Sequence, residues 1–400
     1  MSLVLHDVRW ASRGRTGRGD LRIARGRIAE LAGQCAPRRG DIVLELSGRW
    51  VLPGLINGHD HLGLNLLPRL GNPPYASFYD WAEEIYRPDE SPIADMNRVP
   101  MADRLAWGAW RNVFGGATSV AQHDPWRAPP FSFQQISRNF RERAFPVTVV
   151  RCAWGHSLGY EPDLPSRYRP DRPFVVHAAE GVDERAHGEV AELERLGLLQ
   201  ANTVLVHAMA LSDDDLALLA RRRCKVVWCP ASNARLYGQS ARVAMLLRAG
   251  VTVVLGTDST LSGGLTLLHE LQQAAQTGEA SPDELIAMVT HAAATAFGLQ
   301  DSRGALEPGG RADLIVVPDR GAPSDSLLGA LPRDLQLVLA AGRPLLADPE
   351  LAGALALGPA NLTVDNVRRW IDVRFVRLRE RIATALGPDY PHGDLWRLVS

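Results

Sequence analysis

The sequence predicts an α/β protein: a TIM-type (β/α)8 barrel with a small β-sandwich built from both chain ends. Three observations lead to this fold. The chain has 400 residues, well above the roughly 100–200 residues of an average domain. Its middle alternates apolar strand-like runs with longer helical patterns, as a parallel sheet covered by helices requires. Both ends contain short β-rich runs between Gly-rich turns, too few at either end to bury a core alone.

The predicted domain boundaries follow these changes of pattern. Residues 1–52 and 304–350 are expected to meet in one composite β-sandwich, although two unrelated β-meanders remain an alternative. Residues 53–303 match the roughly 250 residues of an eight-fold β/α barrel. Residues 351–400 form a C-terminal helical extension. Within it, the amphipathic stretch 364–386 predicts one helix that packs on the barrel or on a partner subunit.

Seven of the eight barrel strands can be placed from their β-branched, apolar runs. The missing strand is expected within 124–173, where Pro and Arg obscure the periodicity. The aromatic, Pro-rich stretch 72–100 is expected to be a loop over the pocket. The seven strands are 55–59, 117–123, 147–153, 174–180, 203–209, 225–230 and 251–259.

Composition excludes several classes of protein. The 44 basic and 45 acidic residues give a net charge of −1, which argues against an electrostatic nucleic-acid or membrane-surface binder. Four cysteines without dense spacing do not form a disulfide framework. The start lacks the apolar core of a secretory signal, and no run approaches the ~18 apolar residues that span a bilayer. We therefore expect a soluble, cytoplasmic protein.

Polar residues fall repeatedly at the C-terminal ends of the predicted strands. In a parallel barrel these ends open on one face, where such folds place their active sites. Four imidazoles and two carboxylates are costly to bury unpaired, so the pattern implies either a metal ion or a tight hydrogen-bonded network. The six residues are His59, His61, His177, Glu180, His207 and Asp258.

The spacing of these residues suits a metal centre. His59 and His61 are two apart, so in a strand both side chains face the same side, and Asp60 between them points away as a structural residue. Glu180 is three residues after His177 and so must lie just past the strand end, which suits a mobile proton carrier. Imidazole nitrogens with a carboxylate oxygen suit zinc, and also iron(II) or manganese.

The chain also resembles a known family. The segments PGLINGHDH, HAAE, VHAM, WCPASN and GTDS, with a closing GALEPGGRADLIVV, are similar to those of the amidohydrolase superfamily. They resemble most its mononuclear deaminase branch, which includes S-adenosylhomocysteine and adenosine-type deaminases, guanine deaminase and the triazine hydrolases. The resemblance covers nearly the whole chain, including the split β-sandwich around the barrel.

The resemblance implies a role for each residue of the set. Glu180 would carry protons from the activated water to the leaving group. His207 would polarise the water or steady the oxyanion, and Asp258 would also accept a proton. One divalent metal ion, foremost zinc with iron or manganese as alternatives, would be held by His59, His61, His177 and Asp258.

Counting lysines bears on the number of metal ions. Binuclear members of the superfamily commonly bridge two metals through a carboxylated lysine on the fourth strand. The single lysine of this chain, Lys225, begins the strand that leads into WCP, so a lysine-bridged pair is excluded. A bridge through Cys152 remains conceivable, against its reading as a small core residue.

The chain departs from the family pattern where the substrate would be selected. It has HDH where HTH is usual, serines and threonine after Asp258 where glycine and small residues are usual, and a compressed fourth-strand segment. No catalytic residue is lost, but no named substrate can be transferred.

Five further residues are candidate substrate contacts, each with a plainer alternative. His123 and His156 end strand-like runs, and the alternative is a hydrogen-bonded histidine. Trp126 and Trp154 could stack on a planar ring, or belong to the core or a lid. Asn233 in WCPASN matches a family position that shapes the pocket, or forms an Asx turn.

The predicted function is metal-dependent hydrolysis of a C–N bond, foremost the hydrolytic deamination of a small, flat, neutral amino-substituted heterocycle. The alternative is a hydrolase of the same fold that acts on an amide, amidine or halogenated ring without releasing ammonia. A non-catalytic metal-containing binding protein is a third possibility, against which Glu180 and His207 argue, because binding needs no proton shuttle. The expected partner is a small-molecule substrate, with neither nucleic acid nor membrane, and a homodimer is possible.

Overall fold

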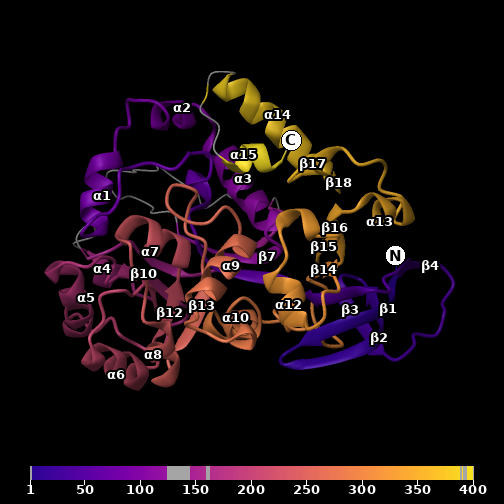
Figure 1. Cartoon of the computed structure of the whole chain (residues 1–400), viewed down its shortest axis with the longest axis horizontal. Helices are drawn as coiled ribbons and strands as arrows, with labels where there is room; N and C mark the ends of the chain where they lie inside the picture. The colour runs from indigo at the N-terminus through magenta and orange to yellow at the C-terminus, as the bar shows by residue number, and fades with distance from the viewer. Residues whose placement is uncertain (1, 124–144, 159–162, 388–389, 391–393, 400) are drawn as a thin grey trace.

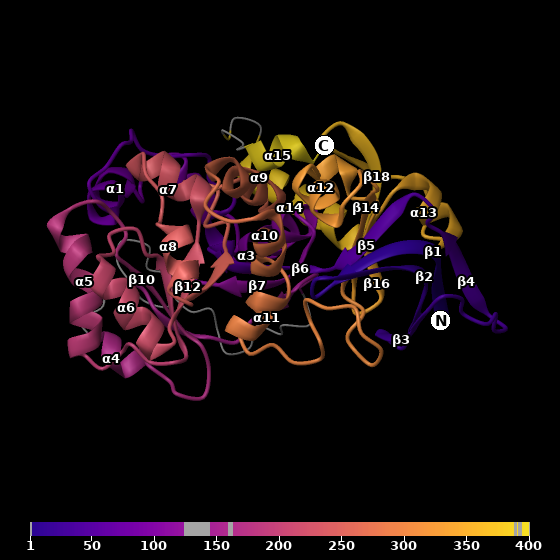
Figure 2. The same ribbon diagram turned by 60° about the horizontal axis from the view of Figure 1, so that its bottom comes forward.

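The structure is a computed structural model that describes residues 2–123, 145–158, 163–387, 390 and 394–399. It is an α/β protein with parallel sheets in the middle of the chain and one large sheet built from both chain ends. Figure 1 shows these two parts next to each other. The middle of the chain lies at the left among helices, and β1, β2 and β3 lie at the lower right. Figure 2 shows the same division after a turn of 60°.

The strands of the middle part lie in two parallel sheets. One has the order β6-β7-β8 and the other the order β13-β12-β11-β10-β9. Most of their residues are buried, as expected where helices cover the faces of a parallel sheet. The strands are β6 (Leu55–Asp60), β7 (Ala117–Gln122), β8 (Thr148–Val149), β9 (Ala153–Gly155), β10 (Phe174–Ala178), β11 (Thr203–His207), β12 (Lys225–Trp228) and β13 (Thr252–Leu255).

Helices connect these strands, and several begin at capping residues. The Ser212 side chain accepts a hydrogen bond from the backbone N–H of Asp215, whose carboxylate accepts the backbone N–H of Ser212, so α6 begins with a capping box. The helices are α1 (Phe78–Ile85), α2 (Ile93–Asn97), α3 (Met101–Phe114), α4 (Leu164–Arg167), α5 (Glu184–Arg195), α6 (Asp213–Arg222), α7 (Pro230–Tyr237), α8 (Val243–Arg248), α9 (Leu267–Thr277), α10 (Pro282–Met288) and α11 (His291–Ala296), with a 3-10 turn at Leu62–Leu64.

Both chain ends meet in one 10-stranded sheet of order β17-β18-β16-β15-β14-β5-β1-β2-β3, in which β4 also pairs with β1. The junction is the antiparallel pairing of β5 with β14, where Pro53 faces Leu314 and Arg49 faces Pro318. The two ends are therefore parts of one sheet and not separate meanders. Its strands are β1 (Ser2–Ser12), β2 (Arg15–Ala24), β3 (Arg27–Ala32), β4 (Asp41–Glu45), β5 (Arg49–Pro53), β14 (Leu314–Pro318), β15 (Leu337–Ala340), β16 (Arg343–Ala347), β17 (Leu362–Val364) and β18 (Val367–Ile371).

The two parallel sheets approach each other at the C-terminal end of β6. The backbone N–H groups of Thr257 and Asp258, just after β13, donate to the carbonyl of His59 at 2.9 and 3.1 Å. Among the described residues no strand ladder joins β13 to β6 or β8 to β9, so the strands form two sheets and not a closed barrel. The hydrogen bonds to His59 nevertheless place the ends of β6 and β13 together.

The strand predicted at 147–153 is divided in the structure. Thr148–Val149 pairs with β7, whereas Ala153–Gly155 pairs with β10, so one predicted strand supplies one strand to each sheet. The second of these strands, Ala153–Gly155, lies within 124–173, the segment in which the eighth barrel strand was expected. Hydrophobic periodicity reports which residues are buried, but it cannot show that one run changes its pairing partner.

Two other predictions of local structure were wrong in part. The stretch 364–386 is not one helix: Val367–Ile371 is a strand, and α14 begins only at Val373. Asp365 and Asn366 both have left-handed φ angles, 48° and 64°, which form the tight hairpin turn between β17 and β18. The stretch 72–100 is not simply a loop, since it contains α1 and α2.

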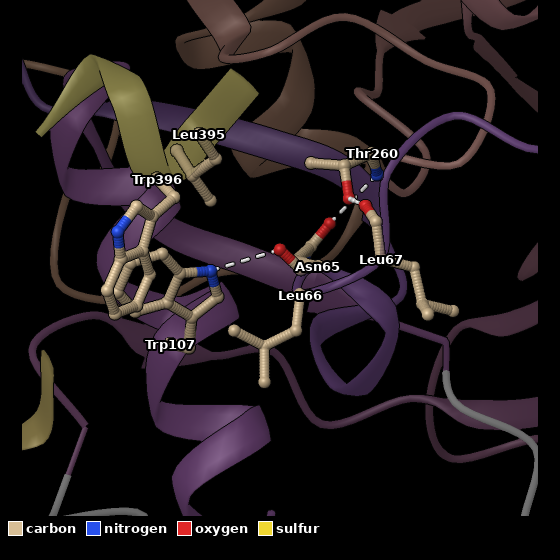
Figure 3. Close-up of a pocket in the computed structure, with 7 residues that line it drawn as sticks. All are labelled: Asn65, Leu66, Leu67, Trp107, Thr260, Leu395 and Trp396. Carbon is tan, nitrogen blue, oxygen red and sulfur yellow. Dashed lines mark hydrogen bonds between the residues drawn. The ribbon is translucent and has the colours of Figure 1, made fainter. Parts of the chain in front are cut away.

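The C-terminal residues pack against α3. Trp107 of α3 stacks on Phe375 of α14 and on Trp396 of α15, with ring centroids 5.5 and 5.2 Å apart. Figure 3 shows Trp396 beside Trp107, whose indole N–H donates to the carbonyl of Asn65 at 3.0 Å. The end of the chain therefore supports the segment that follows β6. The remaining helices are α12 (Pro323–Leu328), α13 (Pro349–Ala354), α14 (Val373–Leu386) and α15 (Asp394–Leu398), with a 3-10 turn at Pro332–Asp334.

Among the described residues, no helix combines the length and the apolar character that crossing a membrane requires.

Candidate active site

The structure brings together all six residues that the sequence places at strand ends. They lie at or just beyond the C-terminal ends of β6, β10, β11 and β13, and each is at most 8% exposed. The potential ligand atoms form overlapping groups in which all atoms lie within 4.8 Å of one another. The groups contain these six residues, His59, His61, His177, Glu180, His207 and Asp258, and also His123, which lies with His59 and His177.

The distances between four of these side chains suit one metal ion. Nε2 of His59 lies 3.3 Å from Nε2 of His177 and 3.8 Å from Oδ1 of Asp258. Nε2 of His61 lies 3.6 Å from the same oxygen. Ligands of a tetrahedral ion at metal–ligand distances of about 2.0–2.1 Å are separated by about 3.3 Å. His59, His61 and Asp258 form one group of candidate metal ligands, and His59 also belongs to a second group with His177 and His123.

The protonation states expected here are those that metal ligands need. Burial, together with the neighbouring imidazoles, holds the pKa of His59 and His177 well below the usual value, so both rings are neutral. Nδ1 of His177 lies 3.0 Å from the carbonyl of His156, which fixes the proton on Nδ1 and leaves Nε2 as a free lone pair. Burial opposes ionisation of Asp258, but the imidazoles of His61 and His207 and two serine hydroxyls lower its pKa. Neutral imidazoles and an ionised carboxylate can bind a metal without losing protons first.

Asp258 is held in place by hydrogen bonds to both oxygens. The hydroxyls of Ser232 and Ser262 each donate to Oδ2 at 2.8 Å, and the backbone N–H of Ser259 donates to Oδ1 at 2.7 Å. Asp258 has a φ of 52°, a strained conformation for a residue with a side chain, which these bonds maintain. Sequence reasoning did not identify Ser232 or Ser262 as part of the site. In the sequence, the serines and threonine after Asp258 indicate only that the chain departs from the family pattern at this position.

Glu180 and His207 form a second pair beside the metal ligands. Oε1 of Glu180 lies 3.4 Å from Nε2 of His207, and Nδ1 of His207 lies 2.8 Å from Oδ1 of Asn233. The Asn233 contact places a proton on Nδ1 of His207 and turns Nε2 toward Glu180. Burial raises the pKa of Glu180 to about 7, despite opposing effects of His207 and a tyrosine hydroxyl. A carboxyl with such a pKa can both accept and release a proton near neutral pH.

A cavity lies over these groups and has one apolar wall. The wall is formed by Leu64, Phe78, Trp81 and Leu261, and the Phe78 ring lies parallel to the His177 ring at 6.2 Å. Phe78 and Trp81 come from α1, in the aromatic stretch that the sequence predicted to cover the pocket. The polar side of the cavity is lined by His61, His156, His177, Glu180, His207, Asp258 and Ser259.

The structure separates the five predicted substrate contacts. His156 lines the cavity. His123 lies behind it, with its ring stacked on His177 at 4.4 Å and its Nε2 2.9 Å from the carbonyl of Gly155. Trp154 stacks on His123 at 5.4 Å, and Asn233 contacts His207. These three residues are not among those that line the cavity. Trp126 lies outside the described residues.

A buried ion pair supports the metal ligands from behind. Arg111 of α3 is 1% exposed and donates to Oδ1 of Asp60 at 2.9 Å, to Oδ1 of Asn65 at 2.8 Å and to the backbone carbonyl of Asp258 at 2.7 Å. It also donates to the carbonyls of Leu265 and Gly264. Figure 3 shows Oδ1 of Asn65 turned toward the backbone N–H of Thr260, just after Asp258. Asp60 thus takes the structural position expected from the HDH spacing.

Arg111→Met should lower the free energy of unfolding by about 3–5 kcal/mol, because it leaves the Asp60 carboxylate buried without its partner. Urea unfolding measures the change. The matched control is Arg381→Met, which breaks the surface pair of Arg381 with Asp103, at 2.6 Å; exposed pairs contribute about 0–1 kcal/mol. Equal effects of the two substitutions would contradict a structural role for the buried pair.

Comparison with known proteins agrees with this geometry. The model of the amidohydrolase family matches residues 171–345. A 5-methylthioadenosine/S-adenosylhomocysteine deaminase of Teredinibacter turnerae is 28% identical over 74% of this chain and 78% of its own length. A 5'-deoxyadenosine deaminase of Methanothermobacter thermautotrophicus is 26% identical over 84% of this chain and 90% of its own length.

Solved structures show the same fold at lower sequence identity. An adenosine deaminase from Xanthomonas campestris with bound zinc has a TM-score of 0.69 at 19% identity and covers 96% of this chain and 98% of its own. Atrazine chlorohydrolase from Arthrobacter aurescens, complexed with zinc, has a TM-score of 0.64 at 20% identity and covers 89% of this chain and 99% of its own. Over residues 171–345 the chain thus resembles the amidohydrolase family, and the curated relatives it resembles are named as deaminases.

Proposed function

We propose that the protein is a zinc-dependent hydrolase that deaminates a small, neutral, amino-substituted heterocycle. The observation that supports the proposal is the combination of overlapping His and carboxylate groups that could hold a metal ion with the pair Glu180–His207 at one cavity. A binding protein would need the ligand set alone. A buried carboxyl beside the ligands, poised to exchange protons near neutral pH, is a feature that hydrolysis uses.

The relatives favour this reaction and this metal. Both curated relatives are named as deaminases of adenosine derivatives, and the two related structures contain zinc. The cavity itself contributes to the choice of substrate. Among the described residues that line it there is neither Arg nor Lys, so none of these side chains offers the permanent positive charge that would favour an anionic group. Its wall of Leu64, Phe78, Trp81 and Leu261 suits the face of a neutral, flat ring.

In this proposal His59, His61, His177 and Asp258 would hold the ion. A divalent ion bound there would lower the pKa of water toward ~7 and so make hydroxide available at neutral pH. Glu180 takes a proton from the attacking water and gives it to the ring nitrogen of the substrate. Asp258 accepts the remaining proton of the water, and His207 donates toward the oxygen as it adds to the ring carbon. The proton held by Asp258 then passes to the amino group, the C–N bond breaks and ammonia leaves, while the ring nitrogen keeps the proton that Glu180 delivered.

Two finer structural readings belong with the proposal. We infer that the two parallel sheets are the parts of an eight-stranded barrel over 53–303, because the backbone of β13 approaches β6 at His59. The sheet from 1–52 and 304–350 would then be the β-sandwich domain. Residues 351–400 would form an extension, which includes β17 and β18 in addition to its helices.

Elemental analysis and product analysis test the function together. Protein purified without chelators should contain about one zinc ion per chain, because the proposed ligands surround one position and leave a place there for the water that hydrolysis needs. The holoenzyme should release ammonia from at least one compound in a panel of adenosine, 5'-deoxyadenosine, 5-methylthioadenosine, S-adenosylhomocysteine and aminotriazines. Two ions per chain would contradict the mononuclear site. Release of chloride from atrazine without ammonia would favour the alternative hydrolase, and metal without any turnover would favour a binding protein.

A further inference from the structure

Tyr237 contacts Glu180 from outside the cavity. It is the last residue of α7, is 4% exposed and does not line the cavity. Its hydroxyl donates a hydrogen bond to Oε1 of Glu180 at 2.8 Å. Burial raises the pKa of the phenol well above its usual value, so the hydroxyl keeps its proton and acts as a donor. Tyr237 follows the WCPASN segment in sequence, but nothing in its sequence context identified it as part of the site.

The contacts of Glu180 divide its two carboxylate oxygens. The hydroxyl of Tyr237 and Nε2 of His207 both approach Oε1, at 2.8 and 3.4 Å. Among the described residues, both of these contacts of the Glu180 side chain are made to Oε1, and neither is made to Oε2. One oxygen is therefore held by two contacts, and the residue itself lines the cavity. A carboxylate without the Tyr237 contact could rotate about its side-chain bonds.

Backbone hydrogen bonds fix the two elements that carry this contact. The N–H of Tyr75 donates to the carbonyl of Leu236 at 2.7 Å, next to Tyr237. The N–H of Phe78 donates to the carbonyl of Glu180 at 3.2 Å. The segment 75–78 thus connects the end of α7 with the turn at Glu180, independently of the tyrosine hydroxyl. Removing that hydroxyl should change the carboxylate without moving the elements.

We propose that Tyr237 is a positioning residue that holds Oε1 of Glu180 and thereby keeps Oε2 directed at the reacting atoms. The inference rests on the proposed role of Glu180 as proton carrier. Residues that orient a group through a hydrogen bond typically contribute about 10–100-fold to activity. Tyr237 would act on the proton-transfer step and not on substrate affinity, because it does not reach the cavity.

Tyr237→Phe removes only the hydroxyl and keeps the buried ring. The holoenzyme variant should show a kcat about 10–100-fold lower, with KM, zinc content and Tm unchanged. The matched control is Tyr75→Phe, which removes a similar hydrogen bond from Tyr75 to Oε2 of Glu84 at 2.6 Å, away from Glu180. This control should keep its kcat. An unchanged kcat in Tyr237→Phe would overturn the inference, as would a loss that follows zinc content or Tm.

Crystal structures of the wild type and of Tyr237→Phe separate this inference from the proposed function. A positioning role requires that the Glu180 carboxylate leaves its place beside His207 when the hydroxyl is absent. If the carboxylate stays, the inference fails whether or not the enzyme is active. If it moves although the wild type turns over no compound of the panel, Tyr237 does position Glu180 and the proposed function is what fails.

Discussion

Glu180→Gln should lower kcat by about 10²–10⁴-fold, the usual contribution of general acid–base catalysis, while the protein keeps its full zinc content. Glutamine fills the same space and can accept the hydrogen bond from Tyr237, but it cannot carry a proton. Glu180 is expected to bind no metal, because the ligand set is complete without it. Steady-state kinetics on a substrate from the panel, with elemental analysis of the same preparation, measures both effects.

The pH dependence gives a second measure of the same role. Glu180 must be ionised to accept a proton from water, and burial raises its pKa to about 7. The kcat/KM of the wild type should therefore decrease as the pH falls below about 7, where the carboxyl is protonated. In Glu180→Gln this limb of the profile should be absent from the residual activity. A profile that is identical in both proteins would assign the ionisation to another group.

Glu189→Gln is the matched control for these measurements. Glu189 is a buried glutamate near the site, but it accepts hydrogen bonds from Tyr79 and from the backbone N–H of Ala179 and does not line the cavity. Its substitution should leave kcat near that of the wild type. Near-normal activity of Glu180→Gln would refute the proton-carrier role, and equal losses in both variants would indicate a general effect of burying an amide.

The clustering of the six polar residues could be predicted because its signal is local. Each of them lies at or just after the end of an apolar run, and the topology of parallel strands brings such ends to one face. His59 and His61 needed only their spacing of two, and Glu180 only its position beyond β10. The polar residues at these strand ends could therefore be identified from the sequence without knowing how the helices and strands pack.

The supporting residues could not be predicted because their partners are distant in the sequence. Arg111 contacts Asp258 from 147 positions away, and Tyr237 contacts Glu180 from 57 positions away. A buried tyrosine or arginine on a helix is a common core residue, so its type alone carries no functional signal. The strand Val367–Ile371 shows that the fold, too, depends on partners outside the local pattern. Its amphipathic pattern continues into α14 and so predicts a helix, but the turn at Asp365–Asn366 pairs it with β17.

Asp258→Asn should weaken both zinc binding and turnover while leaving the fold intact. The carboxylate is the one negative charge in the proposed ligand set, and asparagine removes it without changing the shape of the side chain. The hydrogen bonds predict how the asparagine would lie. Ser259 donates its backbone N–H to Oδ1, so the amide oxygen must take that position. The new NH2 group then faces the hydroxyls of Ser232 and Ser262, which can rotate to accept.

The variant would thus present a neutral oxygen to the metal in place of a charged one. The loss of affinity should exceed the roughly 10–100-fold that removal of an outer partner of a metal ligand costs, and kcat should fall further because Asp258 also accepts a proton. Competition with a chelator measures the affinity, and kinetics at saturating zinc isolates the catalytic part. Asp313→Asn, which alters a buried aspartate beside Arg311 in the end sheet, should change neither. If Asp258→Asn binds zinc fully and turns over normally, the metal is held elsewhere.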